Sequence, residues 1–260
     1  MGGDIAWNPP PMAVLAGDSR SEALVRQLRA DGNQARLVEV TAPGLVPSAT
    51  EWLVIPPSGT VPRPALTLIA NASRGVLAPR RAPWMADLAV PVVTYGDDPT
   101  FVWENARLTG EGALAWALSR TTQTLRGAHP VVYGFGRVGL AAAYYLGAVG
   151  CRVHVVSRND NERGAAGVLG HIPHRLGALP PDITLVINTI PAPVIDEEEA
   201  AQFGGNTPVL DLASDPGGFS QRARRLLGDR LERRPGLPGL AVPETAARVL
   251  REALVRVLRT

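Results

Sequence analysis

Short apolar runs alternate with amphipathic stretches along most of the chain. The apolar runs are bounded by glycine, proline or polar residues, as is typical of buried strands, and they lie at 12–16, 35–40, 51–55, 75–77, 91–95, 131–133, 153–156, 182–187 and 208–212. Leucine, valine and alanine at helical spacing predict helices at 21–30, 99–106, 109–125, 140–149, 222–231 and 243–260. Strands and helices that alternate in this way predict an α/β protein with parallel sheets.

The strongest local pattern lies between residues 131 and 158. An apolar strand leads into a glycine turn, and a helix of small residues and a second strand follow. The turn reads Gly134-Phe135-Gly136-Arg137-Val138-Gly139. In such turns the first glycine permits a tight bend, the second lets backbone approach a pyrophosphate, and the third lets the helix pack closely on the strand. Because the helix N-terminus also attracts anions, we expect a dinucleotide site here; a strand–helix turn without a ligand is the alternative.

The end of the second strand indicates which dinucleotide binds. NAD sites usually have an acidic residue about 20 positions after the glycines, which accepts a hydrogen bond from the ribose 2′-hydroxyl. This chain has Ser157 and Arg158 there, and no acid before Asp160. Because a guanidinium pairs well with phosphate, we expect both residues to bind NADP, with NAD as the second choice. A solvated loop arginine is the alternative.

Two later strands end in polar turns. The strand at 182–187 runs into Asn188-Thr189-Ile190-Pro191, and the strand at 208–212 carries Asp211 and leads to Ala213 and Ser214. Ligands of open α/β sheets bind at the carboxyl ends of the strands. We therefore expect these residues to line the nicotinamide half of the cofactor site.

Two strand ends in the first half of the chain are candidates for binding an anionic substrate. Arg20 lies between the first strand and its helix, where it could hold a carboxylate; a surface arginine paired with Glu22 or with solvent is the alternative. Ser58 and Gly59 follow the third strand in a proline-rich loop and could supply a hydroxyl and N–H groups. An ordinary turn would explain them equally well.

These patterns predict two Rossmann-like domains. Residues 1–108 would form a flavodoxin-like or Rossmann-like substrate domain, and residues 127–241 an NAD(P)-binding Rossmann domain. A hinge helix at 109–126 would join them, with Thr109 as its N-cap and Glu111 in its first turn. A C-terminal helix at 242–260 would pack back against the N-terminal domain.

Composition narrows the chemistry. All 26 basic residues are arginine, so Schiff-base chemistry and a lysine general base are excluded. The single cysteine, Cys151, excludes an internal disulfide and a cysteine-based metal site, and we expect His171 and His174 to be loop residues rather than metal ligands. Because no basic stripe interleaved with aromatic residues is present, small anionic molecules are better partners than nucleic acid. Without a membrane-spanning run or a secretory signal in residues 1–12, a cytoplasmic protein is expected.

Several separated motifs, in order along nearly the whole chain, resemble the A-subunit family of dipicolinate synthase. They are Gly17-Asp18-Ser19-Arg20, Thr109 with Glu111-Gly112, the glycine turn, Asn188-Thr-Ile-Pro191, Asp211-Leu-Ala-Ser214 with Pro216-Gly217-Gly218, and Pro235-Gly-Leu-Pro-Gly239 followed by Pro243, Thr245 and Ala246. The Asp-Leu-Ala-Ser and Pro-Gly-Leu-Pro-Gly segments are specific to the family, whereas the glycine turn is generic. Glu244 departs from the family pattern, in which a lysine is usual, and the segment between Gly59 and Val90 is shorter than expected.

The resemblance implies an NADP-dependent oxidation in the mother cell of endospore-forming bacteria. Dihydrodipicolinate, or its hydroxylated tetrahydro precursor, would be aromatised to dipicolinic acid. The flavoprotein-like B-subunit of dipicolinate synthase is implied as a partner, and a homo-oligomer is also expected. The expected substrate contacts are Arg20, Ser58, Gly59, Thr109 and Gly236. Glu111 or Asp211 would accept the proton; alternatively Glu111 compensates a helix dipole, and Asp211 orients Asn188 or the nicotinamide amide.

Other functions use the same architecture. A 2-hydroxyacid dehydrogenase needs an arginine and a histidine on opposite sides of the nicotinamide, and no suitable histidine is found in the C-terminal half. A shikimate-type dehydrogenase needs a lysine base, which is absent. The chain could instead be a non-catalytic, NADP-sensing component of a two-chain complex.

Overall fold

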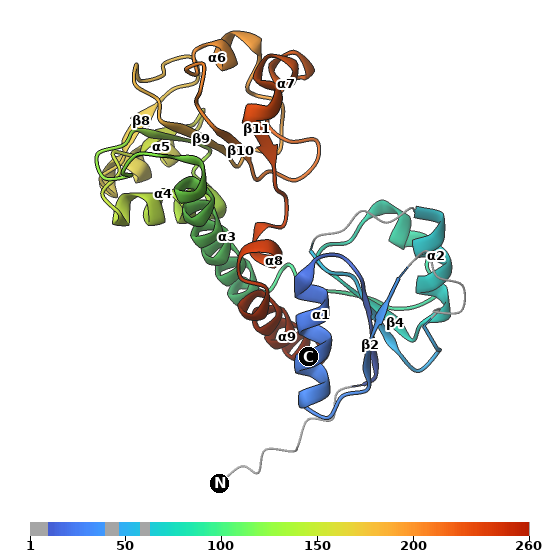
Figure 1. Cartoon of the computed structure of the whole chain (residues 1–260). Coiled ribbons are helices and arrows are strands. Elements are labelled where there is room, and N and C mark those ends of the chain that lie inside the picture. Colours follow the sequence, from blue (N-terminus) through green and yellow to red (C-terminus); the bar gives the residue numbers. More distant parts are fainter. Residues whose placement is uncertain (1–9, 40–46, 58–62, 260) are drawn as a thin grey trace. The chain divides into compact units, whose positions relative to one another are not determined.

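The structure, a computed structural model, describes residues 10–39, 47–57 and 63–259. The chain divides into two compact units (Figure 1). Unit 1 consists of Met1–Asn105 and Pro238–Thr260, and unit 2 consists of Ala106–Leu237. Among the described residues, no helix is both long enough and apolar enough to cross a membrane.

Unit 1 is built on a parallel sheet with the strand order β2-β1-β3-β4-β5. This is the order of flavodoxin-like folds, in which the strand order reverses between the first and third strands. Its elements are β1 (Met12–Leu15), α1 (Ser19–Ala30), β2 (Ala35–Val38), β3 (Trp52–Val54), α2 (Arg63–Ala72), β4 (Gly75–Ala78), a 3₁₀ turn (Pro83–Asp87), β5 (Val92–Thr94) and, from the end of the chain, α9 (Pro243–Arg259).

The C-terminal helix α9 packs beside α1 in unit 1, as Figure 1 shows. Its buried face includes Leu250 and Leu254, as the helical spacing predicts. An ion pair lies beside this apolar contact. Nη1 of Arg251 in α9 lies 2.7 Å from Oδ2 of Asp31, at the end of α1. Glu244 accepts a 2.5 Å hydrogen bond from Arg26 of α1. Both side chains are more than half exposed, so this pair adds little to the apolar contact between the two helices.

Unit 2 is built on a second parallel sheet, with the order β11-β10-β9-β6-β7-β8. Counted from β6, this is the 3-2-1-4-5-6 arrangement of dinucleotide-binding folds, read from the opposite edge. Its elements are β6 (Pro130–Tyr133), α4 (Arg137–Ala148), β7 (His154–Val156), α5 (Asp160–Val168), β8 (Ile172–His174), β9 (Leu185–Asn188), α6 (Glu197–Ala201), β10 (Val209–Asp211), α7 (Gln221–Leu227), a 3₁₀ turn (Gly228–Arg230) and β11 (Leu231–Arg233). The long helix α3 (Pro99–Arg120) begins in unit 1 and continues in unit 2, and α8 (Leu237–Ala241) lies where the chain returns to unit 1.

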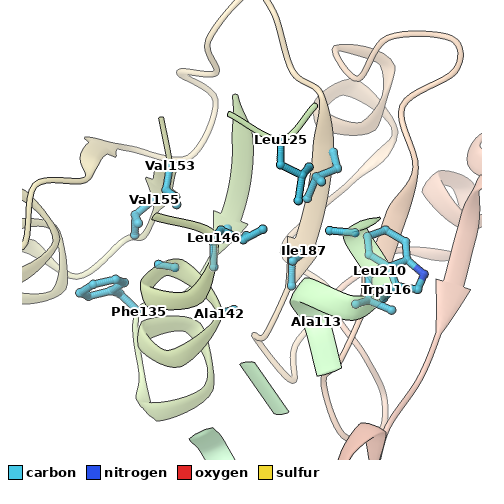
Figure 2. Packing of buried hydrophobic residues seen from close by; sticks show 14 of the residues in the cluster. Ala113, Trp116, Leu125, Phe135, Ala142, Leu146, Val153, Val155, Ile187 and Leu210 are labelled. Carbon is cyan, nitrogen blue, oxygen red and sulfur yellow. The ribbon is translucent and has the colours of Figure 1, made fainter. Parts of the chain in front are cut away.

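One of the two hydrophobic clusters of unit 2 lies between its sheet and the helices α3 and α4, and the other packs α6 and α7 on the sheet. Figure 2 shows Trp116 of α3 and Leu146 of α4 in the same buried cluster as Ile187 and Leu210 of the sheet. Helices α3 and α4 approach closely at Gly110, where a Cβ would lie 2.7 Å from the backbone of Ala141. Each large side chain buried here contributes roughly 1.5–3 kcal/mol to folding. This core supports the ends of β6 and β9.

The predicted hinge helix begins ten residues earlier than expected. The two helices predicted at 99–106 and 109–125 are one helix, α3, from Pro99 to Arg120. Thr109 and Glu111 therefore lie inside a helix, and their predicted places at an N-cap and a first turn are wrong. Residues 106–109 contain no helix-stopping residue, and Gly110 is tolerated because its missing Cβ admits α4. Short elements that the pattern missed are α2, α5, β8, α6, β11 and α8.

Three histidines form a hydrogen-bonded row in unit 2. Nδ1 of His129 lies 3.0 Å from Nε2 of His154, and Nδ1 of His154 lies 2.8 Å from Nε2 of His174. His174, expected in a loop, is the last residue of β8. No group of metal-binding side chains suited to a metal ion is found among the described residues. Burial, followed by the proximity of His174 and His129, lowers the pKa of His154 to about 4.

Acid should therefore destabilise the protein through His154. The folded-state pKa lies below the ordinary 6.5, so the contribution of the neutral ring is complete above that value and is lost as the pH falls towards 4. Between about pH 7.5 and about pH 5 the free energy of unfolding should fall by about 2 kcal/mol from this residue. Urea denaturation at both pH values measures it. The variant His154→Gln should show a smaller fall, and equal falls in both proteins would contradict the expectation.

Candidate functional site

A hollow of about 490 Å³ lies at the carboxyl ends of β6, β7 and β9 in unit 2. The strand order reverses between β6 and β9, which is where open α/β sheets bind their ligands. The lining residues come from the ends of these strands and from the starts of α4 and α5. They are Gly134, Gly136, Arg137, Val138, Ser157, Arg158, Asn159, Glu162, Thr189, Ile190 and Pro191. Nine of these eleven are predicted cofactor contacts; Asn159 and Glu162 are not.

The three glycines of the turn differ in what surrounds them. Gly134 has a φ of +84°, and a Cβ there would lie 2.7 Å from Oγ1 of Thr189. A Cβ at Gly139 would collide with the carbonyl oxygen of Gly134, so the third glycine lets α4 sit against the turn. Nothing lies within 4 Å of the Cβ position of Gly136, and no side chain caps the N-terminus of α4 that begins there. Open backbone with free N–H groups fits the pyrophosphate of a dinucleotide.

An acidic side chain reaches the end of β7 from the following helix. The hydroxyl of Ser157 donates to Oε2 of Glu162 at 2.6 Å, and the backbone N–H of Phe135 donates to the same oxygen at 3.1 Å. Glu162 lies in the first turn of α5, whose N-cap is Asn159. Glu162 was not predicted as a cofactor contact, because the prediction considered only the residues at the end of the strand. Its signal in the sequence is the Asn-x-x-Glu spacing of a helix start.

Two arginines lie near the same strand end. Arg158 is exposed and lines the hollow. Arg163 donates from Nη1 to the carbonyl oxygen of Ser157 at 2.7 Å and pairs with Asp160. Arg163 therefore supports the backbone of the strand end, and Arg158 is the cation that reaches the hollow at this end.

The side-chain amide of Asn188, which is fully buried, holds the turn that follows β9. Asn188 donates from Nδ2 to the carbonyl oxygen of Ile190 and accepts at Oδ1 from the N–H of Ile190, both at 3.1 Å. Thr189 donates its hydroxyl to the carbonyl oxygen of Tyr133 at 2.8 Å. Thr189, Ile190 and Pro191 line the hollow, whereas Asn188, 0% exposed, supports them.

Asp211, predicted as a cofactor contact or proton acceptor, is 1% exposed. Its Oδ1 accepts from Nδ2 of Asn188 at 2.8 Å and from the N–H of Ala213 at 3.1 Å. Its Oδ2 accepts from the N–H of Gly218 at 3.2 Å and lies 3.7 Å from Nε of Arg233. The carboxylate thus holds the turn after β10 against β9. Ala213 is buried and Ser214 is exposed, and neither lines the hollow.

Unit 1 has a buried arginine at its own strand reversal, between β1 and β3. Arg20 is 1% exposed; its N–H donates to Oδ1 of Asp18 at 3.0 Å, and Nη2 lies 3.4 Å from Oδ2 of the same residue. Nη1 of Arg20 also lies 3.4 Å from Oδ1 of Asn105. Burial lowers the pKa of Arg20, while Asp18 and Tyr95 oppose that shift. The alternative of a surface arginine is therefore wrong.

The remaining predicted substrate contacts are distributed over the chain. Ser58 and Gly59 lie outside the described residues. Thr109 is buried within α3, and the carboxylate of Glu111 lies 3.5 Å from Arg107, one turn earlier, with both side chains nearly half exposed. Gly236 has a φ of +82° just before α8.

The sequence comparison and the structure comparison both find A-subunits of dipicolinate synthase. No family model matches the chain. It is 32% identical over 157 residues to the A-subunit of dipicolinate synthase from Bacillus subtilis (strain 168), a match that covers 59% of this chain and 53% of that protein. The chain thus spans, in this match, about half the length of its curated relative.

Solved structures extend the similarity over nearly the whole chain. The crystal structure of the dipicolinate synthase A-subunit from Bacillus halodurans is 25% identical, covers 96% of this chain and 98% of its own, and has a TM-score of 0.76. D-lactate dehydrogenase from Escherichia coli is similar in fold, with 15% identity, 96% coverage of both chains and a TM-score of 0.61. The resemblance seen in the motifs is confirmed, and so is the predicted fold of two Rossmann-like domains.

Replacing Asp211 by asparagine should destabilise unit 2. Three N–H donors converge on the carboxylate, from Asn188, Ala213 and Gly218, and an asparagine would turn an NH₂ group towards one of them. An unsatisfied buried group costs about 1–3 kcal/mol, measurable by chemical denaturation. The control Asp215→Asn removes an exposed acid that pairs with Arg233, and it should change stability by less than about 0.5 kcal/mol. An unchanged stability of Asp211→Asn would contradict the supporting role.

Proposed function

We propose that this chain, which resembles the A-subunit of dipicolinate synthase in sequence and in structure, is a nicotinamide-dinucleotide-dependent oxidoreductase. The observation that carries the proposal is the glycine turn of unit 2, whose open backbone at Gly136 and uncapped helix α4 line a hollow at the strand reversal. The proposed reaction is the aromatisation of dihydrodipicolinate, or of its hydroxylated tetrahydro precursor, to dipicolinate. The name of the relatives supports this product.

The proposed cofactor is NADP in preference to NAD. When bound, its oxidised nicotinamide supplies the hydride acceptor. Ser157 and Arg158 line the hollow at the end of β7, and a guanidinium is well suited to a 2′-phosphate. Thr189, Ile190 and Pro191 line it at the end of β9, where the proposal assigns them to the nicotinamide half.

The proposed anchor for a substrate carboxylate is Arg20 of unit 1. Its position at the strand reversal between β1 and β3 supports this role, because ligands of such sheets bind there. Burial strengthens the pairing of a guanidinium with a carboxylate, since less water competes for either group. Ser58, Gly59, Thr109 and Gly236 are proposed as further contacts.

The proposed proton acceptor is Glu111. The other candidate carboxylate, Asp211, has both oxygens occupied by internal donors, which favours a positioning role for it. Glu111 is open to solvent, so an accepted proton can be released. Aromatisation is itself favourable, and the protein mainly has to align the ring and remove this proton.

The relative is named as one of the subunits of a synthase, which supports a second chain as partner. A homo-oligomer and a cytoplasmic location, that of the mother cell, remain part of the proposal. If the partner carried the chemistry, this chain would be the nucleotide-binding component of the complex, and turnover experiments separate the two functions.

Turnover of freshly generated dihydrodipicolinate should be detectable with the purified chain. Absorbance of the reduced cofactor at about 340 nm and that of the pyridine product should rise together, and faster with NADP than with NAD. A rise that begins only when a second chain is added would contradict a self-sufficient enzyme. Dinucleotide binding without turnover, even with that partner, would favour the nucleotide-binding component. In the same assay Glu111→Gln should lower kcat by about 10²-fold or more with little change in KM.

Substitution of Arg20 should weaken substrate binding selectively. Loss of a charge-assisted hydrogen bond costs about 1.5–3 kcal/mol, so Arg20→Met should raise KM for the dicarboxylate roughly 10- to 150-fold. The dissociation constant of the dinucleotide, measured by calorimetry, should not change. Arg26→Met is the matched control, since Arg26 lies on the same helix, is exposed and bonds Glu244. Arg20→Lys, which keeps the charge, should recover part of the loss; an unchanged KM in Arg20→Met would overturn the assignment.

A further inference from the structure

The carboxylate of Glu162 lines the nucleotide hollow, and its oxygen Oε2 already accepts two hydrogen bonds. One comes from the hydroxyl of Ser157 at 2.6 Å, and the other from the N–H of Phe135 in the glycine turn at 3.1 Å. The hydroxyl of Ser157 in turn accepts from the N–H of Asn159 at 3.1 Å. The side chain is therefore held between the glycine turn and the end of β7.

This position corresponds to the one from which an acidic residue recognises ribose. In NAD sites the acid stands at the end of the second strand, beside the glycine turn, and accepts from the 2′-hydroxyl. Here the strand-end residue is Ser157, and Glu162 contacts both its side chain and the backbone of the turn. The carboxylate reaches the ribose end of the hollow from helix α5 instead of from the strand.

Two side chains of opposite charge line the hollow near the end of β7. Arg158 lines the hollow and is suited to a phosphate, whereas Glu162 repels one. Arg163 is held by the carbonyl oxygen of Ser157 and by Asp160. Asp160 itself lies outside the hollow lining and is 80% exposed, with Arg163 and Arg175 as its partners. Arg137 lines the hollow from the start of α4, and the charged side chains that line it from the end of β7 and the start of α5 are Arg158 and Glu162.

We propose that Glu162 limits the preference of this site for NADP over NAD, by counteracting the attraction of Arg158 for a 2′-phosphate. It accepts a hydrogen bond from the 2′-hydroxyl of NAD and opposes the 2′-phosphate of NADP. Binding of NADP requires the carboxylate to leave Ser157, whose hydroxyl and the N–H of Phe135 then serve the phosphate together with Arg158. This inference rests on the proposed dinucleotide site and deepens it.

Calorimetric titration with NADP and with NAD tests the inference without turnover. In Glu162→Gln, which keeps the shape and removes the charge, the affinity for NADP should rise roughly tenfold or more and that for NAD should fall severalfold. Asp160→Asn is the matched control, because it removes one negative charge from the same helical turn. Its ratio of the two affinities should remain that of the wild type. Arg158→Ala should lower the affinity for NADP and spare that for NAD.

The outcomes separate the inference from the function on which it rests. If both dinucleotides bind but Glu162→Gln keeps the wild-type ratio, Glu162 does not limit the preference for NADP and the dinucleotide site stands. If Asp160→Asn shifts the ratio as much as Glu162→Gln does, the effect is one of general charge and the inference is overturned. If neither dinucleotide binds to the wild-type chain, the proposed function fails and the inference fails with it.

Discussion

The close approach of helix α4 to the end of β6 is the constraint on which the nucleotide hollow depends. Gly139 leaves no room for a Cβ against the carbonyl oxygen of Gly134, and Gly134 itself adopts a positive φ beside Thr189. A side chain at Gly139 would push the helix away from the turn, and one at Gly134 would collide with Thr189 and Ile190. Because both are glycine, the N-terminus of α4 lies at the strand reversal with its first N–H groups uncapped. The dipole and these donors are what an anionic ligand can use.

Buried polar groups hold the loops around this turn. Asn188 and Asp211 lie at the ends of neighbouring strands, are fully paired with each other and with backbone N–H groups, and connect the turns after β9 and β10. Unit 1 repeats the principle with Asp18 and Arg20 after β1. In both units, the polar residues at the strand ends resemble ligand contacts in the sequence. In the structure they also form hydrogen bonds with the backbone and so fix the conformation of the turns. A buried polar group needs hydrogen-bond partners. Even a conservative substitution of such a group therefore lowers the stability of the fold before it alters binding or catalysis.

Much of the architecture could be predicted because it rests on local patterns. The strands buried on both faces read as apolar runs, and the amphipathic face of α9 was visible in its spacing. Short strands at the sheet edges, such as β8 (Ile-Pro-His) and β11 (Leu-Glu-Arg), were missed because they are partly exposed and carry polar residues instead of an apolar run. The start of α3 was misplaced since Thr109 resembles a cap, whereas the helix continues through it to pack Gly110 on α4. Packing between distant segments overrode a local signal there.

The succession of strands and helices, the dinucleotide turn and the family resemblance could all be read from the amino-acid sequence, because each depends on residues close together along the chain. Which polar residues face the hollow and which lie beneath it was settled by the folded arrangement alone. Asp211 is enclosed by donors from three separate positions, and Glu162 reaches the end of β7 through a helix that the strand pattern does not reveal. Exposure and hydrogen bonding of a side chain are set by neighbours remote in sequence, and those neighbours are known only once the chain has folded.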